Sequence, residues 1–242
     1  MESDDLFGAY LAPVFEDRSC AACGAAVHGP QGVICPACAD ADRRERFATF
    51  AAFELTAARE SIPAAYRMCV FGGIELERRL RNTGMSVGYA NAPIGTVLLR
   101  GPSAAGKTSF AAAIFHNHLA RASRMTEPRT DASWAADDSR VRRVATSRFA
   151  RAFAIGAEQP WSDQVAEWRR ADVLVIDDLG AEPDGYRANL VDMISARIDN
   201  LQPCIVTSWL DDRALELRYG EGVLRRLLTA RPSITCLPAG AR

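Results

Sequence analysis

The sequence contains almost no lysine: of its 29 basic residues, 28 are arginine and only Lys107 is lysine. It also lacks a stretch of about 18 apolar residues, so it predicts no membrane-spanning helix. The acidic first residues do not resemble the positively charged start of a secretory signal. We therefore expect a cytoplasmic protein. The net charge of −1 argues against a basic protein that coats nucleic acid.

The composition is that of a folded protein, with 48% hydrophobic and 24% charged residues in 242 positions. Residues 1–42 differ from the rest, because they hold seven acidic residues, one basic residue and four of the seven cysteines. The segment 42–60 has helix-forming residues without glycine or proline, and Pro63 follows it. The predicted organisation is a small module at 1–42, a helical linker at 43–62 and a larger domain at 63–242.

Four cysteines of the first module form the pattern C-x₂-C-x₁₁-C-x₂-C: Cys20, Cys23, Cys35 and Cys38. Two such pairs can hold one Zn²⁺ in a tetrahedron of thiolates, and a short two-stranded ribbon can close the interval between them. Four thiolates leave no open position, so we expect a structural zinc site in a module that binds a protein partner. His28 is an alternative ligand, and redox-active or free thiols are the alternative interpretation. The remaining cysteines lie in apolar segments and are expected in the core: Cys69, Cys204 and Cys236.

From residue 96 onward, short apolar segments alternate with helical patterns. The predicted strands are 96–100, 141–145, 173–176, 204–207 and 233–237. The predicted helices are 74–81, closed by Gly84, then 107–119, 161–170, 185–200 and further helical stretches through Leu228. This alternation predicts an α/β fold with a parallel five-stranded sheet. The polar stretch 121–140 is predicted to be a surface insertion.

Residues 101–108, GPSAAGKT, match the motif G-x-x-x-x-G-K-[ST], and the predicted strand before it and helix after it are the context that the motif requires. Its two glycines permit a backbone whose N–H groups point at phosphate oxygens. Lys107 can reach the β- and γ-phosphates, and the Thr108 hydroxyl can coordinate Mg²⁺. The alternative is a glycine-containing surface turn. We predict binding of ATP and Mg²⁺ by a loop comprising Gly101, Pro102, Ser103, Ala104, Ala105, Gly106, Lys107, Thr108 and Ser109.

A second element of such a site follows about seventy residues later. The segment 173–176 is fully apolar and is followed directly by Asp177 and Asp178. A buried central strand delivers these acids beside the phosphates at its carboxyl end. Asp177 is then the predicted Mg²⁺ partner, and Asp178 would polarise the attacking water. The alternative is a solvated acidic turn after a strand.

Four segments together resemble the bacterial AAA+ ATPases of the DnaC/DnaI helicase-loader and IstB transposition-helper type: GPSAAGKTSFAAAI at 101–114, DVLVIDDLG at 172–180, IVTSW at 205–209 and YGEGVLRRLL at 219–228. SIPAAYR at 61–67 is similar to the lead-in before their ATPase core. The resemblance implies an AAA+ core, a sensor of nucleotide state at Thr207 or Ser208, and Arg226 as the arginine presented to the ATP of a neighbouring subunit. Trp209 departs from the family, which usually has asparagine there.

The resemblance also implies partners: a replicative helicase or a transposase, single-stranded DNA, and further copies of the chain in an ATP-dependent homo-oligomer. The zinc module favours the helicase loader, and the transposition helper is the alternative. A nucleotide-gated interaction module with little turnover is a second alternative, and a small-molecule phosphotransferase is a weaker third. Five central arginines are candidates for phosphate contacts, with a solvated surface as the favoured alternative: Arg140, Arg142, Arg143, Arg148 and Arg151.

Overall fold

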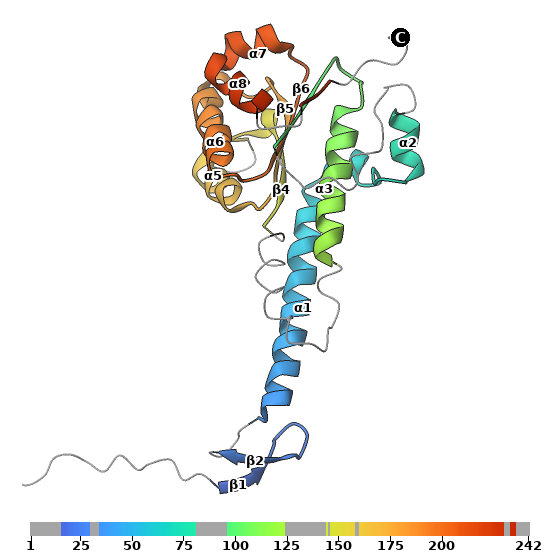
Figure 1. The fold of residues 1–242 in the computed structure, drawn as a ribbon, viewed down its shortest axis with the longest axis vertical. Helices are drawn as coiled ribbons and strands as arrows, with labels where there is room; N and C mark the ends of the chain where they lie inside the picture. Colours follow the sequence, from blue (N-terminus) through green and yellow to red (C-terminus); the bar gives the residue numbers. More distant parts are fainter. Residues whose placement is uncertain are drawn as a thin grey trace, which may run out of the picture. The chain divides into compact units, whose positions relative to one another are not determined.

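The computed structural model describes residues 16–29, 34–80, 96–123, 144, 146–157, 160–229 and 233–235 (Figure 1). The chain divides into two compact units, residues 1–49 and 50–242. Among the described helices, none combines the length and apolar character that crossing a membrane requires.

The first unit contains a small antiparallel ribbon of β1 (Glu16–Ser19) and β2 (Ala26–Gly29). A tight turn joins the strands, in which the Cys20 N–H donates to the Ala25 carbonyl at 2.7 Å and Gly24 adopts a φ of 75°. Glycine takes such a left-handed conformation without the penalty that a side chain would add. The predicted ribbon is therefore present, although its first strand precedes the first cysteine pair.

Helix α1 (Pro36–Glu60) begins six residues before the predicted start at position 42. Proline is favourable at the first helical position, because its missing N–H would have no partner there. Cys35 directly precedes the helix, and its Sγ accepts from the Cys38 N–H at 3.4 Å. One of the unpaired N–H groups of the first turn is thus satisfied by a thiol. The sequence pattern missed this start because cysteine is not among the usual capping residues.

The second unit is built on one sheet of five parallel strands in the order β4-β5-β6-β3-β7. Four of them form its main body: β3 (Val97–Arg100), β4 (Arg148–Arg151), β5 (Leu174–Leu179) and β6 (Cys204–Ser208). The fifth, β7 (Ser233–Thr235), is a three-residue strand at the edge beside β3. The predicted α/β fold with a parallel sheet is confirmed.

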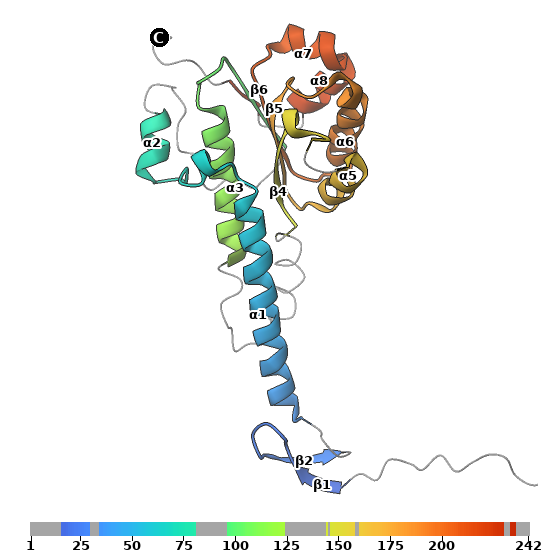
Figure 2. The ribbon, with the colours of Figure 1, turned by 180° about the vertical axis from the view of Figure 1, so that it is seen from behind.

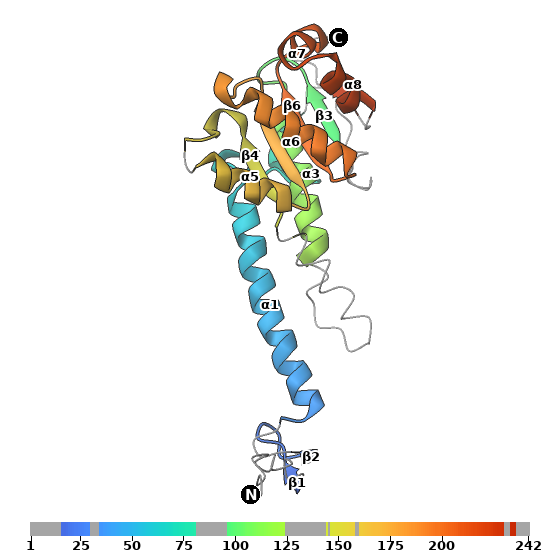
Figure 3. The same ribbon diagram turned by 90° about the vertical axis from the view of Figure 1, so that its left-hand side faces the viewer.

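Helices cover both faces of this sheet (Figures 1 and 2). Leu99, Val175 and Ile205 pack on one side against α3 (Lys107–Ser123), α2 (Ile74–Leu80) and the end of α1. Leu98 and Ile176 point to the opposite side, which α5 (Trp161–Arg170), α6 (Arg187–Asp199), α7 (Asp212–Tyr219) and α8 (Glu221–Thr229) cover (Figure 3). The alternation of side chains along each strand thus supplies two apolar layers.

One predicted strand differs from the structure where the two can be compared. Of the segment 141–145 only Val144 is among the described residues, and it is helical, whereas the strand that follows is β4, at 148–151. Its Phe149 and Ala150 are buried, and the outward-facing N–H of Phe149 donates to Ser61 Oγ at 3.0 Å. Two adjacent arginines interrupt 141–145, which suits a buried strand less well. Gly84 and residues 124–140 of the predicted insertion lie outside the described residues.

The other elements agree with the prediction to within a few residues at each end. The predicted helix at 185–200 is a 3₁₀ turn, η4 (Asp184–Tyr186), followed by α6. Cys69 and Cys204 are fully buried, as predicted, and burial raises the pKa of both thiols. Cys236 lies outside the described residues.

Candidate functional site

The loop 101–106 leaves the end of β3 and enters α3 at Lys107. Three of its residues have left-handed backbone conformations, with φ values of 142° at Gly101, 62° at Ala104 and 83° at Gly106. This geometry turns successive N–H groups inward, and the positive end of the α3 dipole adds to them. The strand, loop and helix predicted from the motif are therefore in place.

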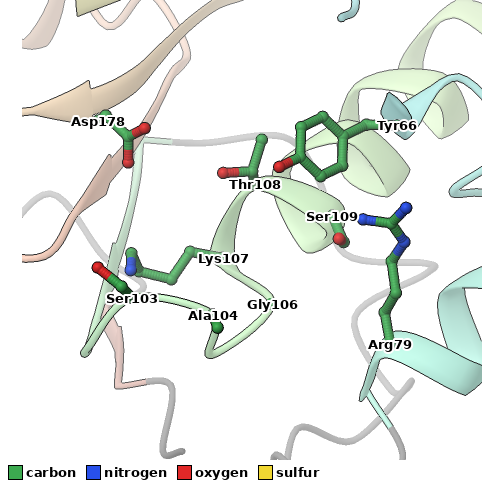
Figure 4. A pocket seen from close by; sticks show the side chains of 9 residues that line it. All are labelled: Tyr66, Arg79, Ser103, Ala104, Gly106, Lys107, Thr108, Ser109 and Asp178. Atoms are coloured by element: carbon green, nitrogen blue, oxygen red, sulfur yellow. The ribbon is translucent and has the colours of Figure 1, made fainter. Parts of the chain in front are cut away.

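A cavity of about 400 Å³ opens over this loop (Figure 4). Its lining residues come from the loop, from the start of α3, from β5 and from two elements that precede the loop in the chain: Ser103, Ala104, Gly106, Lys107, Thr108, Ser109, Asp178, Tyr66 and Arg79. In Figure 4 the Thr108 hydroxyl points toward the side of the cavity on which Asp178 lies. A phosphate chain, a divalent cation and an acidic group could therefore meet in one place.

Lys107 is buried, with 5% of its surface exposed. Its Nζ donates to the carbonyls of Gly101 and Pro102, each at 2.8 Å. These carbonyls hold the ammonium group at the mouth of the loop, where its charge can pair with phosphate oxygens. Since carbonyl oxygens carry only partial charge, an anionic phosphate would be the stronger partner.

The sequence suggested that the two acids follow the end of the strand, but both lie within β5. The pairing of β5 with β6 is irregular between Ile176 and Leu179, and Asp178 adopts a φ of 60°. Such a bulge places one extra residue in the strand and redirects its side chain. Asp177 therefore stays 4% exposed under the loop, while Asp178 reaches the cavity.

Thr207 on β6 holds both acids. Its Oγ1 donates to Asp177 Oδ1 at 2.7 Å and accepts from the Asp178 N–H at 2.8 Å. Burial raises the pKa of Asp177 to about 6, against the opposing effect of the Thr207 hydrogen bond. A divalent cation would favour the ionised form, because it supplies a positive charge to a desolvated carboxylate. Thr108, Asp177 and their surroundings thus offer the hard oxygen ligands that suit Mg²⁺.

The structure distinguishes Thr207 from Ser208. Ser208 Oγ donates to the Leu179 carbonyl at 2.7 Å and accepts from the Leu210 N–H, so it ties two backbone segments together. Trp209 is 52% exposed and lines a separate cavity of about 680 Å³ with Pro102 and Asp212. Of the two hydroxyls, Thr207 is therefore the one directed at the acids.

Sequence reasoning missed two residues of the cavity, Tyr66 in η1 (Ala64–Tyr66) and Arg79 in α2. The Arg79 guanidinium lies 5.1 Å from the centre of the Tyr66 ring, and Glu75 and the Ala65 carbonyl hold it at 2.6 and 3.0 Å. Arg78 and Arg79 lower the pKa of Glu75 to about 2. The available signal was Tyr66 within SIPAAYR, but no motif marks Arg79.

Arg226 lies on α8 and does not line the cavity of its own chain. Its Nη1 lies 3.1 Å from Asp199 Oδ2, and the two side chains are 46% and 59% exposed. The cavity over the loop therefore lacks an arginine from α8 within this chain. An exposed pair of this kind gives little stability and can exchange partners readily.

The four predicted zinc ligands are brought together in the first unit. The Sγ atoms of Cys20, Cys23, Cys35 and Cys38 all lie within 4.8 Å of one another. The N–H groups of Ala22 and Cys35 donate to Cys20 Sγ at 3.4 and 3.2 Å. Four thiols at this spacing, with backbone donors aimed at sulfur, fit a tetrahedral Zn²⁺ site. His28 lies in β2.

The thiols differ in acidity. The backbone N–H of Cys35, followed by those of Cys23 and Ala22, lowers the pKa of Cys20 to about 6, whereas hydrogen bonds from Cys38 to Cys23 and Cys35 raise the pKa of Cys38. One thiolate is thus favoured without metal, and the neighbouring thiols share their protons with it. A metal ion would release those protons, because its ligands must be thiolates.

The central arginines were expected either at phosphates or on a solvated surface. Arg148 is paired with Glu167, and the Arg151 guanidinium lies 4.9 Å from the centre of the Phe153 ring. Both line a cavity of about 460 Å³ with Arg67, next to the edge strand β4. Arg140, Arg142 and Arg143 lie outside the described residues.

Comparison with known proteins gives only low structural similarity and no match in sequence. No protein-family model matches the chain, and no curated protein matches it in sequence. Among solved structures, it is similar to the crystal structure of DnaI with 17% identity and a TM-score of 0.44, over 66% of this chain and 93% of that one. It is also similar to the crystal structure of the DnaC helicase loader with 19% identity and a TM-score of 0.41, over 61% of this chain and 84% of that one.

Proposed function

We propose that this protein binds ATP with Mg²⁺ in the cavity over the 101–106 loop and hydrolyses it. One observation carries the proposal: Lys107, Thr108, Asp178 and the Asp177–Thr207 pair surround the same phosphate-binding loop. They come from three parts of the chain, the start of α3, β5 and β6, and each has the chemistry that phosphoryl transfer requires at its position.

The residues act by position and charge. The loop N–H groups and Lys107 bind the β- and γ-phosphates, and Thr108 and Asp177 would hold the cation. A cation held there would supply positive charge to the phosphate oxygens. Asp178 accepts the proton of the attacking water, and Thr207 fixes the orientation of both acids. The Tyr66–Arg79 pair provides a flat, positively charged wall for the nucleoside end of the nucleotide.

Phosphate release from ATP, measured with Mg²⁺ and with EDTA, tests the activity. The proposal predicts release with Mg²⁺ that Asp178→Asn reduces by roughly 100-fold, because a general base typically contributes 10²–10⁴-fold. Equal release by the wild type and Asp178→Asn would contradict the assignment of this side chain. Asp163→Asn is the matched control, since Asp163 is an exposed acid on α5.

We further propose that the protein acts as a helicase-loader-like AAA+ ATPase that binds a replicative helicase and single-stranded DNA as an ATP-dependent homo-oligomer. The four motif segments support this role, as does the separate four-cysteine module in an acidic part of the chain. In this role the zinc module binds the helicase, and Arg226 reaches the ATP of the neighbouring copy.

Light scattering after size exclusion, with and without ATP and single-stranded DNA, tests assembly. A monomer under all conditions would contradict the loader role. Binding to purified replicative helicase but not to transposase separates the loader from the transposition helper, and the Cys20→Ser chain should lose the helicase interaction while retaining ATP binding.

The second candidate function is a nucleotide-gated interaction module with little turnover. Trp209 favours it, because the indole is half exposed beside another cavity and supplies no polar group to the phosphate site. Tight ATP binding without release of phosphate, even in the presence of helicase and DNA, would favour this candidate over the loader.

A further inference from the structure

Glu182 is a completely buried carboxylate just beyond the two acids of β5, with 0% of its side chain exposed. Burial of a charged group is unfavourable unless hydrogen bonds and opposite charge compensate it. Glu182 has both: Oε2 accepts from the Gly180 N–H at 2.8 Å, and Oε1 accepts from Arg218 Nε at 2.9 Å and the Tyr219 hydroxyl at 2.7 Å. Both oxygens of this carboxylate are therefore occupied.

These donors come from two different places. Gly180 lies in the turn 178–181, which begins at Asp178 near the end of β5, while Arg218 and Tyr219 are the last residues of α7. Arg218 Nη2 also donates to the Glu182 carbonyl at 3.2 Å. The hydrogen bond from Tyr219 adds to burial in raising the pKa of that phenol. The Glu182 carboxylate thus joins the turn 178–181 to the end of α7.

The turn needs such a partner, because its backbone is unusual. Asp178 has a φ of 60° and Gly180 a φ of 114°, and the Ala181 N–H closes back onto the Asp178 carbonyl at 2.9 Å. A side chain at Gly180 would be strained at this φ, and its Cβ would lie 2.8 Å from Leu210 Cδ1, so glycine is favoured here. A non-glycine residue in the left-handed region is held there only by its surroundings.

On the other side, α7 leads directly to the helix that carries Arg226. Gly220, with a φ of 87°, separates α7 from α8, and the two helices pack against the same apolar layer. Tyr219 and Gly220 begin the segment YGEGVLRRLL, yet neither lines the cavity over the phosphate-binding loop. Tyr219 contacts Glu182 instead, through its hydroxyl, and Gly220 with its positive φ ends α7.

We propose that Glu182 is a positioning residue that holds the Asp178 turn in its active geometry and links it to α7 and α8, so that nucleotide in the cavity and the position of Arg226 depend on each other. This inference rests on the proposed ATPase function. Glu182 does not line the cavity over the loop, and acts through the Gly180 N–H and the side chains of Arg218 and Tyr219.

Hydrogen exchange of the full-length protein, with and without ATPγS and Mg²⁺, tests this link. In Glu182→Gln the amide oxygen can still accept hydrogen bonds, but an NH₂ group replaces the second carboxylate oxygen. This NH₂ group faces another donor, so one hydrogen bond is lost. Without nucleotide, this variant should exchange faster over 178–182 and 212–220. With nucleotide, residues 101–109 should be protected in both proteins, and 212–229 only in the wild type.

Two further variants serve as a milder change and a control. Tyr219→Phe removes one hydroxyl and should weaken the response of 212–229 without affecting 101–109. Asp184→Asn is the matched control, because this acid also lies near Arg218, at 3.5 Å, but is 81% exposed. It should behave as the wild type. In hydrolysis, Glu182→Gln should lower kcat by about 10-fold and leave KM within about 3-fold, which is the pattern of a lost transition-state interaction.

The outcomes separate the two proposals. Unchanged exchange over 178–182 and 212–220 in nucleotide-free Glu182→Gln would overturn the positioning role, whatever ATP does. Protection of 212–229 in Glu182→Gln equal to that of the wild type would overturn the link. Absence of protection over 101–109 in the wild type would overturn the proposed nucleotide site, while the nucleotide-free comparison would still decide the role of Glu182.

Discussion

Thr207 and Asp177 form a hydrogen bond of 2.7 Å between neighbouring parallel strands, and the same hydroxyl accepts from the Asp178 N–H. One small side chain thereby fixes a buried acid and the backbone of the acid next to it. The pair lies at the carboxyl edge of the sheet, where parallel α/β folds bind ligands. Because the Thr207 hydroxyl contacts both acids, a ligand that binds these acids would also affect the hydrogen bonds of Thr207.

Thr207→Val should lower ATP hydrolysis by about 10-fold to 100-fold and change ATP affinity little. Valine has the same shape but neither donates to Asp177 nor accepts from Asp178, so the acids lose their orientation. Steady-state phosphate release and equilibrium nucleotide binding measure the two effects. Ser208→Ala is the control: it should lower thermal stability through its two lost backbone contacts, with the catalytic constant of the folded protein preserved. Equal kinetic losses in both variants would contradict the distinct role of Thr207.

The raised pKa of Asp177 predicts that the stability of the nucleotide-free protein depends on pH. Its pKa is raised from 3.8 to about 6, so between about pH 4 and 6 the folded protein binds more protons than the unfolded chain. The free energy of unfolding therefore falls as pH rises through this window, by up to about 3 kcal/mol from this group.

Asp177→Asn removes that cost and should raise the melting temperature at pH 7.5 in EDTA by several degrees, while abolishing the effect of Mg²⁺ on nucleotide binding. Thermal melts at pH 4.5 and 7.5 check the sign, because the gain should be smaller at the lower pH. Asp178→Asn is the matched control, since this side chain is only partly buried. A destabilised Asp177→Asn at pH 7.5 would contradict the account.

The four-thiol cluster should hold one Zn²⁺ per chain in protein purified without chelator. Cys38→Ser should reduce the zinc content to less than about half an equivalent, because a hydroxyl is a poor replacement for a thiolate. Cys69→Ala is the control: this cysteine is buried in the core of the second unit and should leave zinc content unchanged. A wild-type protein without zinc that forms disulfides between these cysteines would favour the redox alternative.

Arg226→Ala should leave ATP binding and folding unchanged, because its exposed pair with Asp199 contributes little. It should lower hydrolysis by about 100-fold or more if an arginine acts across subunits, as it does in other phosphoryl-transfer enzymes. Mixing Arg226→Ala with Lys107→Ala should restore part of the activity, since each supplies what the other lacks. Arg225→Ala is the control, and absence of recovery on mixing would contradict action between subunits.

The sequence predicted best those features in which a short pattern dictates a local structure. The P-loop, the parallel strands and the clustered cysteines follow from glycine positions, apolar runs and pair spacing. The bulge at Asp177–Asp178 could not be predicted, because it depends on the register between β5 and β6. The wall formed by Tyr66 and Arg79 depends on tertiary contacts, as do the partners of Glu182. The early start of α1 was missed because a thiol takes the place of a usual cap.

Calorimetric titration of ATP and Mg²⁺ into the wild type and Lys107→Ala tests the central claim most directly. Lys107 is the only lysine of the chain, and its ammonium lies at the mouth of the 101–106 loop. Loss of this charge-assisted contact should weaken binding by roughly 100-fold, or about 2.7 kcal/mol. Binding near one equivalent by the wild type, with little or none by a folded Lys107→Ala, is the predicted result. Equal affinity of the two proteins for ATP would contradict the account.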